Sequence, residues 1–377
     1  MRLLYLVSED WYFCSHRLPL ALAAKRAGYD VHVATRLSVH EERLKDLGFT
    51  VHSIGMNRSS RGVSDVFQLA ELFWLYQRVR PDIAHHVAIK PVIYGTLAAM
   101  AVPKTVVVNA LAGLGFLFTG EAGAKSTAGR LVRTLMPWCL RGRRRHVIVQ
   151  NPTDAAFATH QGVSKGNLNL IRGSGVDVDM FSPTPEPDGV PVAAMVARLL
   201  MDKGVGELVE AARLLRAGGV PLRIALVGAP DPDNPASASQ AQVDAWVREG
   251  IVEWWGHRDD IAQVWREAHI AVLPSYREGL PKSLLEAASS SRPLISTDVP
   301  GCRDVVKHES NGLLVAPKMA KPLADALETL AMSKALRLEY GANARKDVLA
   351  HFAESHIVKQ TLNVYSRALS LSTTETP

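Results

Sequence analysis

Cysteine is scarce in this sequence. The 377 residues contain three cysteines, Cys14, Cys139 and Cys302, which lie far apart. An odd number at these spacings forms neither a disulfide framework nor a CxxC metal clip. We therefore expect three reduced thiols, as is typical of a cytoplasmic protein.

Long hydrophobic runs are also missing. The first apolar run, Leu3–Val7, ends at Ser8-Glu9-Asp10, too early for the core of a signal peptide. The most apolar segment, Pro91–Phe118, is interrupted by Lys104 and by several Gly and Pro residues. It falls short of the roughly 20 continuous apolar residues of a transmembrane helix. We expect no membrane-spanning segment.

Acidic residues are absent between Glu121 and Asp154. The same stretch is basic, and its apolar residues include Trp138. Its cations are Lys125, Arg130, Arg133, Arg141, Arg143, Arg144 and Arg145. Such a helix suits the anionic inner face of the cytoplasmic membrane, so Arg130–Arg145 predicts a peripheral membrane protein. The alternative is a helix packed on a sheet with solvated arginines at its end. No base-reading module accompanies the net charge of +6, so no nucleic-acid partner is expected.

Glycine is absent from the turn after the first β-rich run. Ser8–Phe13 is polar and aromatic, whereas a dinucleotide-binding fold needs glycines there so that its backbone can approach a pyrophosphate. This argues against NAD or FAD binding by the first half. The turn is better suited to a sugar or another acceptor.

Short β-rich runs alternate with amphipathic helices, which predicts parallel sheets with right-handed crossovers. The predicted strands are Leu3–Val7, Val31–Thr35, Val51–Ile54, Ile83–His86, Thr105–Asn109, Val147–Gln150, Val192–Ala197, Leu222–Val227, Val252–Trp255, Ile270–Leu273 and Leu294–Thr297. A Pro-rich segment at 182–191 separates two series and reads as a linker. We predict an α/β protein with two Rossmann-like domains, 1–181 and 192–350, facing across a cleft. The closing helix, within 351–377, is expected to cross back to the first domain.

Two cations follow the first strand of the second series. Arg198 lies at the strand end and Lys203 at the start of a helix. Ligands of open α/β sheets bind at this edge, so the pair is suited to a diphosphate. The alternative is two surface cations, although a cation at a helix N-terminus opposes the helix dipole.

A second motif, Glu278–Glu286, follows the predicted strand Ile270–Leu273. Gly279 allows close backbone approach, and Pro281 suits the first turn of a helix that presents N–H groups to a phosphate. Glu286 then lies roughly 6–8 Å along that helix. This is the reach from a bound phosphate to the ribose of the same nucleotide, unless Glu286 is an ordinary acid of a first helical turn.

These motifs resemble the retaining glycosyltransferases with the GT-B fold, often called family 4, over nearly the whole chain. Further segments resemble a bacterial subgroup that acts on undecaprenyl-diphosphate-linked sugars. They are residues 82–86, 90–95, 113–119, 173–177 and 300–303. The chain departs from the family in its first loop, which has no glycine, and at Gly228–Pro235, which replaces a Gly-x-Gly-Pro.

The resemblance implies a role for each motif. Arg198 and Lys203 would bind the donor diphosphate, Glu278 would contact the sugar and Glu286 the ribose. The phosphate-binding loop would comprise Gly279, Leu280, Pro281 and Lys282. The acceptor side is assigned to His16, His85, His86 and Lys90. The donor is expected to be a UDP-sugar and the acceptor a polyprenyl-diphosphate-linked saccharide.

The expected chemistry is a front-side displacement that retains the anomeric configuration. The cations and the helix N-terminus would stabilise the departing nucleoside diphosphate. Asp177-Val178-Asp179 has the form of a metal-binding DxD, but we expect no metal or other cofactor. Two alternatives remain: a nucleotide-sugar 2-epimerase on the same architecture, and a nonenzymatic nucleotide-sugar sensor.

Overall fold

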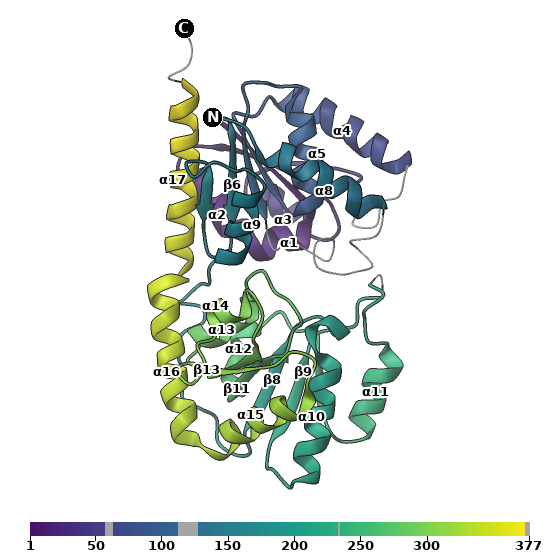
Figure 1. Cartoon of the computed structure of the whole chain (residues 1–377), viewed down its shortest axis with the longest axis vertical. Helices are drawn as coiled ribbons and strands as arrows, with labels where there is room; N and C mark the ends of the chain where they lie inside the picture. The colour runs from purple at the N-terminus through teal and green to yellow at the C-terminus, as the bar shows by residue number, and fades with distance from the viewer. Residues whose placement is uncertain (57–62, 112–126, 233, 374–377) are drawn as a thin grey trace. The chain divides into compact units, whose positions relative to one another are not determined.

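The computed structural model describes residues 1–56, 63–111, 127–232 and 234–373, and the chain divides into two compact units (Figure 1). The first unit comprises Met1–Ser174 and Ile357–Pro377, and the second comprises Gly175–His356. The motif at 113–119 lies outside the described residues. Each unit contains one parallel sheet with helices on both faces, which confirms the predicted pair of Rossmann-like domains.

The first sheet has the strand order β3-β2-β1-β4-β5-β6-β7, and every pairing is parallel. Its strands are β1 (Arg2–Glu9), β2 (Asp30–Arg36), β3 (Thr50–Ser53), β4 (Ile83–Val87), β5 (Val106–Leu111), β6 (Arg145–Val149) and β7 (Leu168–Leu170). Six of them were predicted. The seventh, β7, has three residues and therefore leaves little alternation to recognise.

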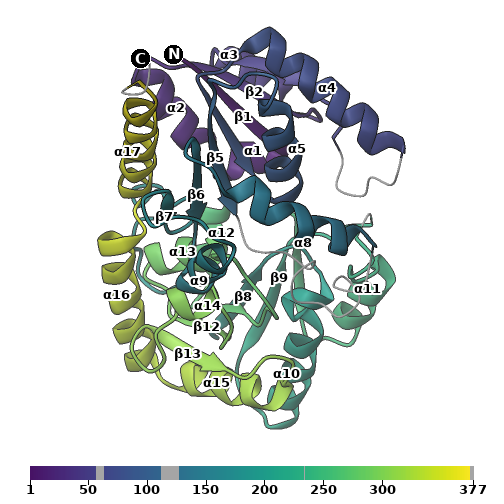
Figure 2. The ribbon, with the colours of Figure 1, turned by 45° about the horizontal axis from the view of Figure 1, so that its top comes forward.

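Alternate residues of β1 face the two sides of this sheet. Leu3, Tyr5 and Val7 pack towards α1, α2 and α17, whereas Leu4 and Leu6 pack towards α4 and α5. Figure 2 shows α17 and α4 on opposite sides of the strands. The helices are α1 (Asp10–His16), α2 (Leu18–Arg26), α3 (Glu41–Asp46), α4 (Val63–Val79), α5 (Ile89–Ala99), α8 (Thr127–Leu140), α9 (Pro152–His160) and α17 (Glu354–Thr373).

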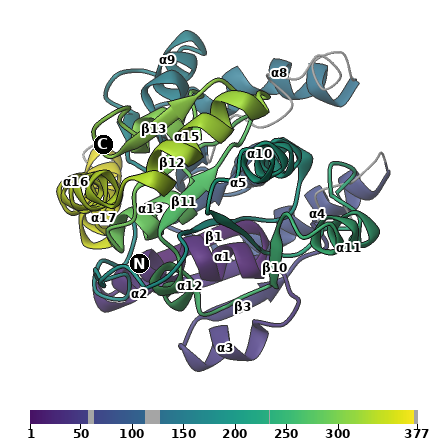
Figure 3. The same cartoon turned by 90° about the horizontal axis from the view of Figure 1, so that it is seen from below.

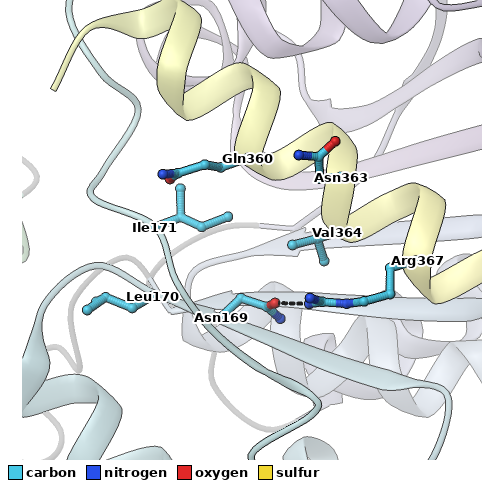
Figure 4. Close-up of a pocket in the computed structure, with 7 residues that line it drawn as sticks. All are labelled: Asn169, Leu170, Ile171, Gln360, Asn363, Val364 and Arg367. Atoms are coloured by element: carbon cyan, nitrogen blue, oxygen red, sulfur yellow. Dashed lines mark hydrogen bonds between the residues drawn. The ribbon is translucent and has the colours of Figure 1, made fainter. Parts of the chain in front are cut away.

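The last helix, α17, completes the first unit, as predicted. Ile357, Val364 and Ala368 belong to the same core cluster as β1. Arg367 donates from Nη2 to the Asn169 side chain beside a pocket of about 240 Å³ between β7 and α17 (Figure 4). An apolar stripe thus buries the helix on the sheet, and a polar contact fixes it at its edge.

The second sheet has the order β10-β9-β8-β11-β12-β13 and is also parallel. Its strands are β8 (Val192–Val196), β9 (Arg223–Val227), β10 (Glu253–Gly256), β11 (Ile270–Leu273), β12 (Leu294–Thr297) and β13 (Gly312–Val315). The bounds of β11 and β12 match the prediction. The edge strand β13 was not predicted, because Gly-Leu-Leu-Val is too short to tell from a buried helix segment.

Helices cover both faces of the second sheet. Helix α10 contacts α15 on one face, while α13 contacts α12 and α16 on the other (Figure 3). The elements are η1, a 3-10 turn (Met201–Lys203), α10 (Val205–Ala217), α11 (Gln240–Arg248), α12 (Ile261–Glu267), α13 (Lys282–Ser289), α14 (Cys302–Val305), α15 (Ala320–Met332) and α16 (Lys334–His351).

The predicted linker, 182–191, packs on the second unit, and the division between the units falls earlier, at Ser174–Gly175. Glu186 forms a buried ion pair with Arg337, whose Nε lies 2.8 Å from Glu186 Oε1. The carbonyl of Pro187 lies 2.9 Å from Nε2 of His269. Residues 182–191 are therefore an ordered segment packed on the second unit. Proline content alone does not distinguish such a segment from a flexible linker.

Candidate active site

The candidate site lies at the carboxyl edge of the second sheet. From β8 the chain continues to β9 and β10 on one side, and from β11 to β12 and β13 on the other. The strand order thus reverses between β8 and β11, which is where open α/β sheets bind ligands. Arg198 follows β8 and Glu278 follows β11, so two motifs far apart in sequence meet at this reversal.

Gly204 lets the turn after β8 pack against the loop after β11. It has a φ of +78°, and a Cβ there would lie 2.1 Å from the carbonyl oxygen of Pro274. The two segments are also joined by Tyr276, whose N–H donates to the carbonyl of Asp202 at 2.9 Å. Lys203 is therefore placed beside the loop that carries Glu278.

Lys203 and Glu278 form an ion pair, with 2.5 Å between Lys203 Nζ and Glu278 Oε1. Both side chains are mostly buried but retain some solvent exposure. The predicted phosphate-binding cation and the predicted sugar-contacting acid thus neutralise each other. The remaining exposure leaves the ammonium within reach of an anionic ligand, which would have to displace the Glu278 carboxylate.

Arg198 is also paired in this structure. Its Nη1 bonds Asp231 Oδ2, and both side chains are partly exposed. Asp231 lies in the Gly228–Pro235 segment, which the sequence identified only as a departure from the family pattern. No short-range signal links Asp231 to Arg198, because they approach each other only when β8 and β9 are adjacent in the sheet.

Glu286 lies on the fifth residue of α13 and is 8% exposed. Burial raises its pKa to about 7, and Lys282, whose Nζ is 3.6 Å from Glu286 Oε1, opposes this rise. A buried carboxyl near neutrality can bind ribose hydroxyls as an acceptor once ionised. Glu286 thus lies on the helix where the sequence placed it, and its contact with ribose stays a prediction.

The segment that leads into α14 packs against the backbone of the loop that precedes α13. Gly301 has a φ of +82°, and a Cβ there would meet the carbonyl oxygens of Glu278 at 2.5 Å and Gly279 at 2.6 Å. The first helical turn of α13 begins at Lys282, directly after this loop. Its N–H groups and the positive end of its dipole are therefore close to Glu278.

The predicted acceptor-side histidines of β4 are buried on opposite faces of the first sheet. His86 Nδ1 lies 2.8 Å from Asn109 Oδ1, and its Nε2 lies 2.6 Å from the Tyr76 hydroxyl. His85 Nδ1 lies 2.5 Å from the hydroxyl of Tyr365 on α17. Both ring nitrogens of His86 thus have protein partners, whereas His85 Nε2 has none among the described residues.

The other two acceptor-side residues lie near the surface. His16 ends α1 and stacks on Tyr12, with ring centroids 4.2 Å apart. Lys90 Nζ lies 3.2 Å from Asp65 Oδ1 and 5.2 Å from the centre of the Tyr94 ring. The structure therefore gives each of the four residues a different environment within the first unit.

The basic apolar stretch forms α8 and the turn that follows it. Trp138 is 39% exposed, and the Arg145 guanidinium lies 4.3 Å from its ring centre. A groove of about 910 Å³ runs along this turn, lined by Thr96, Ala99, Met100, Pro103, Thr105, Val107, Thr134, Pro137, Trp138, Arg141, Gly142, Arg143, Arg144 and Arg145. Four arginines of the turn after α8 thus line one groove beside the exposed Trp138.

The Asp177-Val178-Asp179 segment forms a turn. Oδ1 of Asp177 accepts the N–H groups of Asp179 at 3.0 Å and Met180 at 2.9 Å. Within the described ranges no cluster of three or more His, Cys, Asp or Glu residues suits a metal ion. In the same ranges no helix is long and apolar enough to cross a bilayer.

The chain is similar to known glycosyltransferases over most of its length. The chain is 26% identical over 370 residues to the N,N'-diacetylbacillosaminyl-diphospho-undecaprenol alpha-1,3-N-acetylgalactosaminyltransferase of Campylobacter jejuni, covering 94% of this chain and 95% of that protein. It is 24% identical over 315 residues to the UDP-Gal:alpha-D-GlcNAc-diphosphoundecaprenol alpha-1,3-galactosyltransferase of Escherichia coli, covering 79% and 78%.

Solved structures share the fold. Sucrose-phosphate synthase from Thermosynechococcus elongatus matches with a TM-score of 0.81 at 20% identity, covering 98% of this chain and 99% of that one. Anabaena HepE in complex with UDP-glucose matches with a TM-score of 0.77 at 18% identity, covering 97% and 100%.

Two protein families match the two halves of the chain. Residues 2–151 match the family described as glycosyl transferase 4-like, and residues 190–333 match glycosyl transferases group 1. Together they account for most of the sequence, and the chain therefore belongs to the 4-like, group 1 glycosyltransferases with the GT-B fold.

Proposed function

We propose that this glycosyltransferase moves a sugar, with retention of configuration, from a UDP-sugar to a polyprenyl-diphosphate-linked saccharide. The observation that carries the proposal is the Lys203–Glu278 pair at the strand-order reversal, with Arg198 after β8 and Glu286 on the nearby helix α13. Relatives that act on undecaprenyl-diphosphate-linked sugars support the acceptor class, and one of them is named for a UDP-sugar donor.

In the proposed reaction the acceptor hydroxyl attacks the anomeric carbon as the bond to the β-phosphate oxygen breaks. The attack is on the same face as the leaving group, and the hydroxyl proton passes to a β-phosphate oxygen. Arg198, Lys203 and the N-terminus of α13 stabilise the negative charge on the departing nucleoside diphosphate. No residue needs to form a covalent intermediate.

The Lys203–Glu278 pair is proposed to open when the donor binds. The diphosphate takes the Lys203 ammonium, and the released Glu278 carboxylate then accepts hydrogen bonds from sugar hydroxyls. Glu286 is proposed to accept both ribose hydroxyls. The two acids therefore have different ligands, unlike the paired carboxylates of a glycosidase.

The proposed site needs no metal ion, because two cations and a helix N-terminus supply the positive potential. Activity in excess EDTA should match activity without it.

The protein is further proposed to act on the inner face of the cytoplasmic membrane, with the α8 stretch and its groove against anionic lipid.

The test is a panel of nucleotide sugars incubated with polyprenyl-diphosphate saccharides, with nucleoside diphosphate release and lipid-linked product both measured. Transfer with the donor's anomeric configuration in the product supports the proposal. Conversion of the nucleotide sugar to its 2-epimer without transfer, or tight donor binding with no turnover on any acceptor, would overturn it.

A further inference from the structure

Helix α4 is apolar on its outer side as well as on its inner side. Leu72 and Tyr76 are buried in the core cluster that covers β1. The opposite side carries exposed apolar residues that together form the α4 stripe: Val66, Phe67, Ala70, Phe73 and Trp74. Spacings of three, four and seven residues place them on one side of the helix. Phe67 is 71% exposed and Trp74 is 72% exposed, so aromatic rings face solvent where a surface helix of a globular protein carries polar residues.

The α4 stripe is nearly free of charge. From Val66 to Trp74 the one charged residue is Glu71, and its Oε2 accepts the N–H of Gly55 at 2.8 Å. Single exposed apolar residues are ordinary on a protein surface, but a contiguous aromatic stripe marks a surface that binds another molecule. The α4 stripe is therefore an interaction surface, and its neighbours indicate the partner.

The surface next to the α4 stripe is also apolar. Helix α5 contacts both α4 and α8 on one face of the first sheet (Figure 1). Gln77, in the last turn of α4, donates from Nε2 to the carbonyl of Ala101 at 3.0 Å. The residue before Ala101 is Met100, which is exposed and lines the groove beside α8 together with Trp138. Exposed apolar side chains thus continue from α4 past the end of α5 to α8.

The charges around this apolar surface are mostly positive. Arg78 and Arg80 are exposed at the end of α4, and four arginines line the groove. The acidic Asp65 forms an ion pair with Lys90, with 3.2 Å between Oδ1 and Nζ. A second copy of this chain would bring cations against cations, whereas anionic lipid headgroups neutralise them. Because tryptophan also favours the membrane–water interface, this surface is suited to an anionic bilayer rather than to self-association.

We propose that the α4 stripe inserts into the boundary between the headgroups and the acyl chains of an anionic membrane, while the arginines of the groove contact the headgroups. This inference deepens the proposed membrane location and rests on it. Salt screens the attraction between arginines and anionic lipids, but it does not screen the burial of apolar side chains. The stripe and the arginines therefore make contributions that ionic strength separates.

Co-sedimentation of the full chain with vesicles of phosphatidylglycerol and phosphatidylcholine in equal parts measures both contributions. The wild type should bind more weakly at about 1 M salt than at about 0.1 M, but binding should persist. Phe67→Ser combined with Trp74→Ser should weaken binding at least tenfold at either salt concentration. Leu338→Ser combined with Leu349→Ser removes two exposed apolar side chains of α16 and should leave binding unchanged.

Fluorescence quenching by vesicles with brominated acyl chains reports on the depth of Trp74. Bromine quenches an indole ring only at short range, so a ring that stays in water keeps its emission. Trp74→Phe keeps an apolar aromatic ring, so this variant should bind vesicles as the wild type does and yet lose a measurable part of the quenching. Trp246→Phe, on α11, removes a tryptophan outside the stripe and should keep the wild-type quenching.

Three results would contradict insertion of the stripe. The first is unchanged vesicle binding by the folded protein that carries Phe67→Ser and Trp74→Ser. The second is equal quenching in the wild type and in Trp74→Phe, which decides the question where the double variant does not fold. The third is a wild-type dimer without lipid that becomes a monomer in the double variant, as measured by analytical ultracentrifugation, because the stripe would then join two copies of the chain.

The proposed function and this inference fail separately. Neither vesicle measurement needs turnover, so absence of transferase activity leaves both results intact. Absence of wild-type binding at either salt concentration would remove the proposed membrane location and the inserted stripe with it. Wild-type binding that is weakened only by arginine substitutions would retain the location and remove the stripe from it.

Discussion

The candidate active site consists, at the scale of single residues, of charges that are already paired. Lys203 is held by Glu278 and Arg198 by Asp231. The Arg198–Asp231 pair is partly exposed, which keeps it weak, whereas the Lys203–Glu278 pair is more buried. We therefore expect a phosphate ligand to replace these carboxylates as the partner of each cation.

Asp231 limits the affinity of Arg198 for a phosphate. We expect Asp231→Asn to tighten nucleoside diphosphate binding roughly two- to fivefold, because an exposed pair contributes about 0.2–1 kcal/mol. Arg198→Ala should lower turnover at least tenfold, which is about 1.4 kcal/mol. Calorimetry and initial rates measure the two effects.

Asp325→Asn is the matched control, because Asp325 pairs with Lys321 on the exposed face of α15. It should alter neither quantity. Unchanged turnover in Arg198→Ala would remove Arg198 from the mechanism.

If Glu286 binds the donor's ribose as proposed, donor binding should depend on pH. Its pKa is raised to about 7 by burial, and ribose hydroxyls bind the ionised form, so the donor Kd should weaken as pH falls below 7. The limit is tenfold per pH unit, since one unit corresponds to 1.36 kcal/mol. Glu286→Gln should abolish this dependence, whereas Glu328→Gln, at an exposed residue of α15, should preserve it.

The same raised pKa affects stability with a defined sign. Between the unfolded value, near 4.5, and about 7 the folded protein holds a proton that the unfolded chain has lost. The free energy of unfolding therefore falls as pH rises through this window. Denaturant titrations at several pH values should show this slope in the wild type and a smaller slope in Glu286→Gln. Equal slopes would contradict the assignment.

At the scale of elements, the site depends on glycines that let loops from different strands touch. Gly204 places the turn after β8 against Pro274, and Gly301 places the α14 segment behind Glu278 and Gly279. Neither contact leaves room for a side chain. The conformation of the predicted phosphate-binding loop thus depends on backbone packing as much as on its own sequence.

Replacing Gly204 tests this packing. Gly204→Ala and Gly219→Ala introduce the same methyl group at φ values of +78° and +70°, but Gly219 has nothing within 4 Å of the added atom. Both should pay about 1 kcal/mol for the left-handed conformation. Gly204→Ala should cost about 2 kcal/mol more from overpacking. Urea unfolding measures the free energy of unfolding of both variants. Equal decreases would show that the turn at Gly204 can move to accommodate the added methyl group.

Sequence patterns located most elements and placed the second-unit motifs at one sheet edge. The strands β11 and β12 and the start of α13 were predicted from apolar runs, Pro281 and the motif spacing. Asp231 and the partners of His85 were missed, since long-range pairing brings them together. Residues 182–191 were predicted to be a linker because prolines disfavour helices and strands both in flexible linkers and in ordered segments.

At the scale of the whole molecule, the chain crosses between its units twice, at Ser174–Gly175 and at His356–Ile357. The second unit is continuous in sequence, whereas the first is completed by α17. Removal of residues 357–377 should therefore expose the α17 face of the first sheet. Hydrogen exchange should quicken in β1 and β4 and stay slow in β8 and β11. Equal acceleration in both sheets would contradict the division.

Membrane binding should depend on the basic stretch Arg130–Arg145, which comprises most of α8 and the turn after it. Arg130→Gln combined with Arg143→Gln should weaken binding to anionic vesicles roughly tenfold or more, at about 1 kcal/mol per cation. Lys334→Gln with Lys346→Gln removes the same charge from exposed residues of α16 and should have little effect. Vesicle co-sedimentation at low and high salt measures both, and equal losses would indicate a nonspecific effect of net charge.

The position of α17 also sets an order for folding during synthesis. A ribosome that has made β1 to β7 must still translate Gly175–His356 before the helix that covers Tyr5 and His85 exists. At roughly 5–20 residues per second this takes roughly 10 to 40 s. During that time the second unit can finish folding while the part of the first unit's apolar face that α17 covers stays exposed. The nascent chain is therefore a natural client for a chaperone, although each finished unit has a complete core.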